Sequence, residues 1–179
     1  MRIRLLILLT LLPTALIAQA FNPGKEASTK STSYLNPSYQ LTLDAAVALV
    51  KQARICANNL GKSVTISVLD ASGQVILISR QESVGPHNTE ASRRKAYTSV
   101  STKTPTLALS RNARSNPDTE NLASLPELLL LGGGCPLWFE GKLVGAIGVA
   151  GGGSPENDDL IAKSASIQQA GIFTELNQP

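Results

Sequence analysis

The sequence contains few of the residues that most often build metal and nucleophile sites. It has one histidine, His87, and two cysteines, Cys56 and Cys135, in 179 residues. A single histidine excludes zinc sites made from several histidines, the HExxH motif and the CxxCH motif. A Ser-His-Asp triad would need His87, yet the chain has no GxSxG turn to expose a nucleophilic serine. No nucleophile–base–orienter set or pair of carboxylates points to an enzyme.

Clustered positive charge and phosphate-binding motifs are also missing. Of the 16 Lys and Arg residues, two lie in residues 1–20, which leaves 14 against 13 Asp and Glu in the rest of the chain. This balance excludes a nucleic-acid binder, which needs a basic face to neutralise phosphates. The glycine run 151–153 matches neither GxGxxG nor GxxxxGK[ST], and acidic residues follow it at the start of the expected last helix. We therefore exclude a nucleotide site there.

The N-terminus has the pattern of a secretory signal peptide. Arg2 and Arg4 precede an apolar run over residues 5–17, and Ala18-Gln19-Ala20 fits the small-x-small cleavage pattern. The run is shorter than the ~20 residues that a membrane span needs. We expect residues 1–20 to be a cleaved signal peptide of a secreted or periplasmic protein, with no stable membrane span afterwards; the alternative is an uncleaved anchor.

The rest of the chain divides into two parts. Residues 21–39 are rich in Ser, Thr, Asn, Pro and Lys, which predicts a flexible lead-in. Residues 40–176 form the expected domain, beginning with an amphipathic helix that Thr42 caps and Gly61 ends. Its length suits one hydrophobic core.

Two hairpins frame a helical middle in this domain. The first joins residues 64–69 and 74–80 across an Asp-Ala-Ser-Gly turn, and the second turns at Glu140-Gly141. Between them we predict a helix capped by Asn88 or Thr89 and a shorter helix over 107–114. A last helix begins with Ser154 as N-cap and Pro155 as its first residue, and Gly171 marks its expected end. The pattern predicts an α+β fold, with an antiparallel sheet built from two hairpins and flanked by helices.

Four segments in this order resemble a known family. They are Val68-Leu-Asp-Ala-Ser-Gly73, Ala91-Ser-Arg-Arg-Lys-Ala-Tyr-Thr98, Gly133-Gly-Cys-Pro-Leu137 and Gly141-Lys-Leu-Val-Gly-Ala-Ile-Gly-Val149. Together they resemble the GlcG/HbpS-like haem-binding proteins, a family that includes the C-terminal domain of PduO. The resemblance implies a profilin-like layout, frequent homo-oligomers and binding of haem or a related tetrapyrrole.

His87 and Tyr97 are the candidate iron ligands under this resemblance. A neutral imidazole is a good ligand for haem iron, and His87 lies in a Gly-Pro loop at an expected helix start. A phenolate also binds ferric iron, which makes Tyr97 the second candidate. The ordinary alternatives are an exposed loop histidine and a half-buried helical aromatic.

Arg94 and Lys95 are the candidate partners for haem propionates, with Arg93 as their neighbour. Consecutive residues of a helix point in different directions, so only one or two of the three can face one site. Lys95 is the preferred candidate because it lies inside the segment that carries the resemblance. The alternative for each is a solvated helix face.

The function expected from this reading is binding or sequestration of haem outside the cytoplasm. Two alternatives stay open: a non-catalytic oligomeric accessory subunit, and an enzyme acting on haem or a small hydroxy acid. Cys56 and Cys135 either form a disulfide in an oxidising compartment or are two small buried side chains.

Overall fold

The computed structural model describes Tyr34 and residues 37–176. The chain divides into two units, Met1–Asn36 and Pro37–Pro179. All the helices and strands named below lie in the second unit. The expected signal peptide and most of the expected lead-in lie outside the described residues. Among those described, no helix is both long and apolar enough to cross a membrane.

One antiparallel sheet forms the centre of the domain. Its strands are β1 (Thr65–Asp70), β2 (Val75–Arg80), β3 (Gly134–Phe139), β4 (Lys142–Ala150) and β5 (Ile172–Phe173), in the spatial order β2-β1-β4-β3-β5. The two predicted hairpins are therefore confirmed, and β1 of the first pairs with β4 of the second. The short β5, which the sequence analysis missed, pairs with the end of β3.

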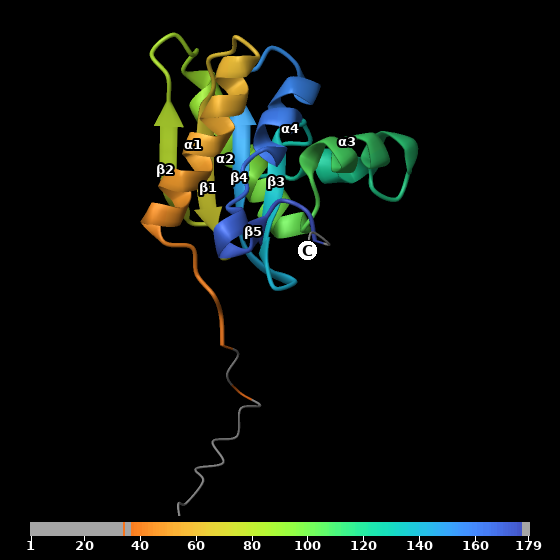
Figure 1. The fold of residues 1–179 in the computed structure, drawn as a ribbon. Coiled ribbons are helices and arrows are strands. Elements are labelled where there is room, and N and C mark those ends of the chain that lie inside the picture. The colour runs from red at the N-terminus through yellow and green to blue at the C-terminus, as the bar shows by residue number, and fades with distance from the viewer. Residues whose placement is uncertain (1–33, 35–36, 177–179) are drawn as a thin grey trace, which may run out of the picture. The chain divides into compact units, whose positions relative to one another are not determined.

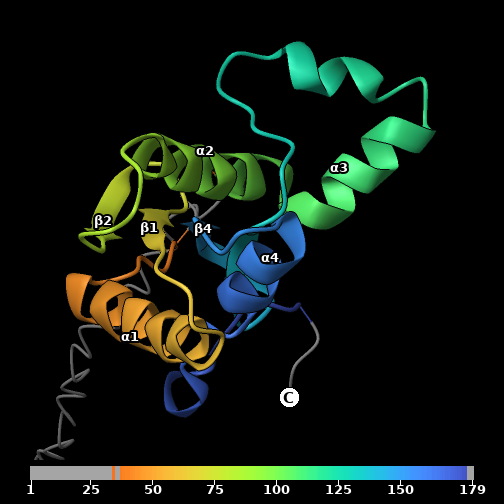
Figure 2. The same ribbon diagram turned by 90° about the horizontal axis from the view of Figure 1, so that it is seen from above.

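Helices cover both faces of the sheet (Figures 1 and 2). The helix α2 (His87–Thr102) packs on one face, mainly against β4, β1 and β3. On the other face lie α1 (Leu43–Asn59) and α4 (Pro155–Lys163). The helix α3 (Thr106–Ser115) and the 3₁₀ helix η2 (Glu120–Ser124) extend to the side as an arm. A further 3₁₀ turn, η3 (Gln168–Ala170), precedes β5. The predicted α+β class is confirmed.

Aliphatic side chains and the Cys135 side chain make the buried core. Sixteen buried residues between the sheet and the α1–α4 face form the main cluster, and Leu69, Ala96, Val100 and Ala146 form a smaller one under α2. No aromatic ring is among the buried core residues of the described part of the chain.

Glycines allow α2 to approach the sheet closely. A Cβ on Gly148 of β4 would collide with the Ser92 carbonyl oxygen, and one on Gly134 of β3 would collide with the Lys95 carbonyl oxygen. Beside this contact the Ser67 and Ser92 hydroxyls, both buried, lie 2.6 Å apart. Any larger residue would push α2 away from the strands.

Capping residues in the sequence predicted the starts of α1 and α4 correctly. The Thr42 hydroxyl accepts a hydrogen bond from the Ala45 N–H, and the Ser154 hydroxyl accepts one from the Asn157 N–H. Two boundaries were wrong. The helix α2 begins at His87, ahead of both predicted caps, because Pro86 already has helical angles. The helix α4 ends at Lys163, well before Gly171, because the chain turns back to form β5.

Candidate functional site

An open groove lies where the N-terminal ends of α2 and α4 meet the end of β4. Its volume is about 410 Å³, within the range of about 300–1,000 Å³ that is typical of ligand pockets. The groove, called the His87 groove below, has one wall from α2 and the other from the segment 150–158. These walls are lined by His87, Asn88, Ala91, Lys95, Leu131, Ala150, Gly151, Gly153, Ser154, Pro155 and Asp158.

Four of these residues come from a single face of α2. His87, Ala91 and Lys95 are spaced by four residues, and residues four apart in a helix lie one above the other. The spacing puts the imidazole at the outer end of the groove and the lysine at its inner end, with a small alanine between them. The wall is therefore open at its centre.

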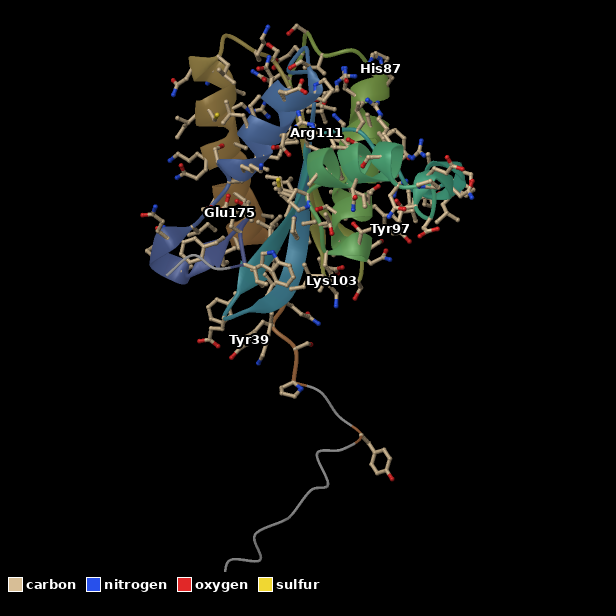
Figure 3. The ribbon with its side chains drawn as sticks, turned by 90° about the vertical axis from the view of Figure 1, so that its right-hand side faces the viewer. Tyr39, His87, Tyr97, Lys103, Arg111 and Glu175 are labelled. Atoms are coloured by element: carbon tan, nitrogen blue, oxygen red, sulfur yellow. The ribbon has the colours of Figure 1, made fainter. Side chains whose placement is uncertain are left out.

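His87 is exposed, at the first residue of α2. Neither of its ring nitrogens has a hydrogen-bond partner among residues 37–176. The ring lies against Gly85: a Cβ built there would be 3.0 Å from the His87 Cε1 atom and 3.2 Å from Nδ1. Both nitrogens are thus available to an incoming ligand. Figure 3 shows His87 at one end of the domain.

Lys95 and Asp158 form an ion pair at the inner end of the groove. The Lys95 side chain is 1% exposed, and its Nζ donates to Asp158 Oδ2 at 2.7 Å and to the Val149 carbonyl oxygen at 3.0 Å. The other carboxylate oxygen, Oδ1, accepts from the Gly152 N–H at 2.7 Å. The pair therefore joins α2 on one face of the sheet to the glycine turn and α4 on the other.

Burial shifts both members of this pair toward their neutral forms. The pKa of Lys95 is lowered because its ammonium group is removed from water, and the Asp158 charge and hydrogen bond oppose that shift. The pKa of Asp158 is raised for the same reason, opposed by Lys95 and by backbone N–H groups. Each charged group is stabilised by the other. If either one paired with a ligand instead, its partner would be left buried without a counter-charge, which is costly.

Gly133 makes the ion pair possible. Its φ of +119° is one that side-chain-bearing residues rarely adopt. A Cβ there would be 2.7 Å from Asp158 Cβ and 3.2 Å from Lys95 Nζ. The lysine crosses the edge of the sheet through the space that this glycine leaves, which explains the glycines at the start of the GGCPL segment.

Of the four predicted site residues, the structure brings His87 and Lys95 to one groove and places Tyr97 and Arg94 elsewhere. Tyr97 lies ten residues beyond His87 on α2, about 15 Å along the helix axis, and its ring contacts Gly73 in the first hairpin turn. Arg94 donates from Nη2 to the carbonyl oxygens of Pro126 and Leu128, at 2.6 and 2.8 Å. It holds the chain that returns from the arm.

Sequence reasoning missed one residue that lines the groove, Asp158, and one lysine beside the groove residue Gly153, Lys62. Asp158 was assigned only to the helix start, and Lys62 to no site. The Lys62 Nζ lies 3.5 Å from the position that a Cβ on Gly153 would take, and it forms no ion pair with the described residues. A loop lysine 91 residues away in sequence carries no signal of this approach, since only the fold brings it to the groove rim.

Other metal and thiol chemistry finds no support in the described residues. No group of three or more His, Cys, Asp and Glu side chains there is placed to hold a metal ion. Cys56 and Cys135 are both free thiols; Cys135 is buried and Cys56 half-buried, so the interpretation as a small buried side chain fits Cys135 alone. Burial raises the pKa of the Cys135 thiol far above its ordinary value, so this thiol is unreactive.

The comparison with protein families identifies the fold's relatives. The model of the family described as "Haem degrading protein HbpS-like" matches residues 41–166. This chain belongs to the HbpS-like family. The resemblance noted in the four sequence segments is thereby confirmed.

Individual members of the HbpS-like family and its relatives agree with this assignment. The corrinoid adenosyltransferase PduO of Citrobacter freundii is 30% identical over 141 residues, which are 78% of this chain and 42% of PduO. The chain therefore spans less than half the length of that relative. A double mutant of HbpS from Streptomyces reticuli is 32% identical with a TM-score of 0.68, over 74% of this chain and 88% of its own.

A solved complex of PduOC with haem is also similar. It is 30% identical to this chain and has a TM-score of 0.69, covering 76% of this chain and 99% of PduOC. The match thus takes in the whole of that domain.

Proposed function

We propose that this protein binds haem in the His87 groove, with the His87 imidazole as an axial ligand to the iron. The observation that carries the proposal is the free, exposed imidazole at the mouth of a ligand-sized groove. It is supported by membership of the HbpS-like family and by similarity to a domain solved with haem. Haem would supply an iron centre there, whose reactivity depends on its axial ligand and surroundings.

The walls of the groove suit the body of a porphyrin. Ala91, Leu131, Ala150 and Pro155 offer apolar surface, and burying apolar ligand surface is favourable by roughly 25 cal/mol per Å². Haem is amphipathic, so its propionates need a cation or water at the rim. We assign that role to the Lys62 ammonium group beside Gly153, since Lys95 is already paired with Asp158.

Lys95 and Asp158 then act as positioning residues. Their hydrogen bonds hold the Gly152 turn and the end of β4, which together make the wall opposite His87. A wall fixed before binding lowers the entropy lost on binding. Tyr97 and Arg94 have no part in this site.

The setting of this activity follows from the N-terminal pattern. Residues 1–20 direct export in our proposal, and the protein works in the periplasm or outside the cell as a homo-oligomer. Cleavage after Ala20 is tested by mass spectrometry of the protein recovered from an exporting host. Multi-angle light scattering tests the assembly.

The test of haem binding is a hemin titration of the wild-type protein and of His87→Ala, followed at the Soret band. We expect saturable binding with a shifted band in the wild type and at least about tenfold weaker binding in the variant, which corresponds to about 1.4 kcal/mol. Tyr97→Phe is the matched control and should bind as the wild type does. Following the Soret band over hours with added reductant separates binding from degradation, because only degradation removes the band.

Two results would contradict the proposal. Absence of saturable binding would refute the haem function and make an accessory subunit the leading interpretation, ahead of an enzyme acting on a small hydroxy acid. Equal binding by His87→Ala, together with loss in Tyr97→Phe, would keep the function and move the iron to the other end of α2.

A further inference from the structure

A second hollow lies at the opposite end of β3 and β4 from the His87 groove. Its volume is about 450 Å³, and we call it the aromatic hollow. Trp138, Phe139 and Phe173 are among its lining residues, together with Glu140 and Glu175. No lysine, arginine or histidine is among its lining residues in the described part of the chain.

The placement of these rings is unusual for this protein. Only 4% of the chain is aromatic, and no aromatic residue is among the buried core residues of the described part. Trp138, Phe139 and Phe173 are instead left half-buried around one hollow. Removing an aromatic side chain from water is strongly favourable, because its ring buries a large apolar surface. Phe139 also packs against the main core cluster, whereas Trp138 and Phe173 do not, and half-buried aromatic residues at a hollow point to a ligand that completes their burial.

The cluster already holds one cation. The Tyr39 ring packs edge-on against Phe139, with ring centroids 4.8 Å apart, and the Lys142 Nζ lies 5.0 Å from the centroid of Tyr39. Cations bind to aromatic faces through the ring quadrupole. The Tyr39 hydroxyl also donates to Glu140, at 3.4 Å. The Tyr39 face is thus occupied, and Tyr39 is not among the described residues that line the hollow.

Glu140 has a backbone conformation that few such residues adopt. Its φ is +48°, and among the described residues other than glycine only Lys103 also has a positive φ. With Gly141 at +71° it forms the tight turn between β3 and β4. Glycine or asparagine would fit that position with less strain.

We propose that the aromatic hollow binds a small organic cation with a quaternary ammonium head group. Trp138 and Phe173, which are paired across β3 and β5, would contact its methyl groups, and the Glu140 carboxylate would balance its charge, which is the chemistry of an aromatic cage. Haem is a poorer occupant, because its propionates would face two carboxylates. This site is independent of the haem proposal, since it shares no residue with the His87 groove.

Choline is the probe, and the single tryptophan of the chain is the reporter. We expect choline to change Trp138 fluorescence saturably in the full-length protein. Its neutral isostere 3,3-dimethylbutanol has the same shape without the charge and should bind at least about tenfold more weakly, or about 1.4 kcal/mol. Glu140→Gln should weaken choline several-fold, and His87→Ala should leave it unchanged.

Calorimetry repeats the titration without depending on the tryptophan, and there Phe173→Leu should also weaken binding. Equal binding of choline and its isostere would overturn the proposal, because the hollow would then recognise shape alone. Absence of saturable binding in both methods would also overturn it. A Trp138 fluorescence signal that changes when the protein is diluted without choline would also overturn the proposal, because the hollow would then be covered by a second copy of the chain.

Discussion

The two ends of β4 offer opposite chemistry. At its Ala150 end, the His87 groove combines an imidazole, small apolar side chains and the Lys95–Asp158 ion pair, whose two charges balance. At its Lys142 end, roughly 27 Å away for a nine-residue strand, the aromatic hollow combines three rings with carboxylates. The first suits an anionic porphyrin and the second a cation. The difference teaches that one sheet can hold two sites of unlike charge when each is built from the loops at one end of its strands.

The largest effect separating the two ends should come from Lys95→Met. The change leaves the Asp158 carboxylate buried without its partner, which typically costs about 3–5 kcal/mol of unfolding free energy. Chemical denaturation of this variant and of Lys51→Met, on the exposed side of α1, measures the difference. Adding Asp158→Asn to Lys95→Met should recover part of the loss, since the amide can still accept from Gly152. Equal stability of all these variants would contradict the role of the pair.

Filling the His87 groove should abolish haem binding and spare the aromatic hollow. Ala91→Trp places a large ring at the centre of the α2 wall, and we expect haem affinity to fall by at least about tenfold. Ala108→Trp, on the exposed arm helix, is the matched control. Choline binding should be unchanged in both variants. Wild-type haem affinity in Ala91→Trp would place haem outside the groove.

Removing the rim cation should have a smaller effect. Lys62→Gln deletes one half-buried propionate partner at the open rim, and ion pairs at the surface contribute about 0.2–1 kcal/mol. A hemin titration at low salt should show haem affinity reduced up to about fivefold, with the Soret position unchanged because the iron ligand remains. High salt should erase the difference. A shifted Soret band would mean that Lys62 acts on the iron environment instead.

The smallest expected effect is the pH dependence of stability that comes from the ion pairs of Arg93. Arg93 pairs with Glu90 at 2.7 Å and with Glu127 at 3.0 Å, beside the chain that Arg94 holds. The hydrogen bond from Arg93 is the main cause of the lowered pKa of Glu90, and the charges of Arg93 and Arg94 add to it. A lowered folded-state pKa stabilises the fold above the unfolded pKa, and that stabilisation is lost as pH falls through the folded value.

Glu90→Gln should therefore be less stable than the wild type near pH 6, by less than about 1 kcal/mol because the pair is exposed. The two proteins should become equal near pH 2, where Glu90 is protonated. Denaturation curves at several pH values measure this. A difference that stays constant with pH would show that the loss is not electrostatic.

Local features were predictable from the sequence, and the site was only partly so. The Asp70 turn, the Thr42 and Ser154 caps and the two hairpins depend on neighbouring residues, and all were confirmed. The partner of Lys95 lies 63 residues away, and the carbonyl groups that bind Arg94 lie more than 30 residues away. These contacts depend on the layers of the fold. An apolar or charged pattern along one helix cannot reveal them.

The segments that carry the family resemblance share a structural role. Gly133 gives space to the Lys95–Asp158 pair, and Gly148 gives space to α2. They preserve the contact between α2 and the sheet, which is why they identify the fold more securely than the ligand. His87 lies outside all four segments, so its role depends on the groove geometry alone.

The most direct test of the central claim is chemical rescue of the iron ligand. Haem bound to His87→Gly should have the absorption spectrum of an iron centre that has lost its imidazole, and free imidazole should restore the wild-type spectrum. Asn88→Gly, one residue along the same wall, should have the wild-type spectrum throughout. If His87→Gly and the wild type have the same spectrum before imidazole is added, His87 does not bind the iron and the account of the groove is wrong.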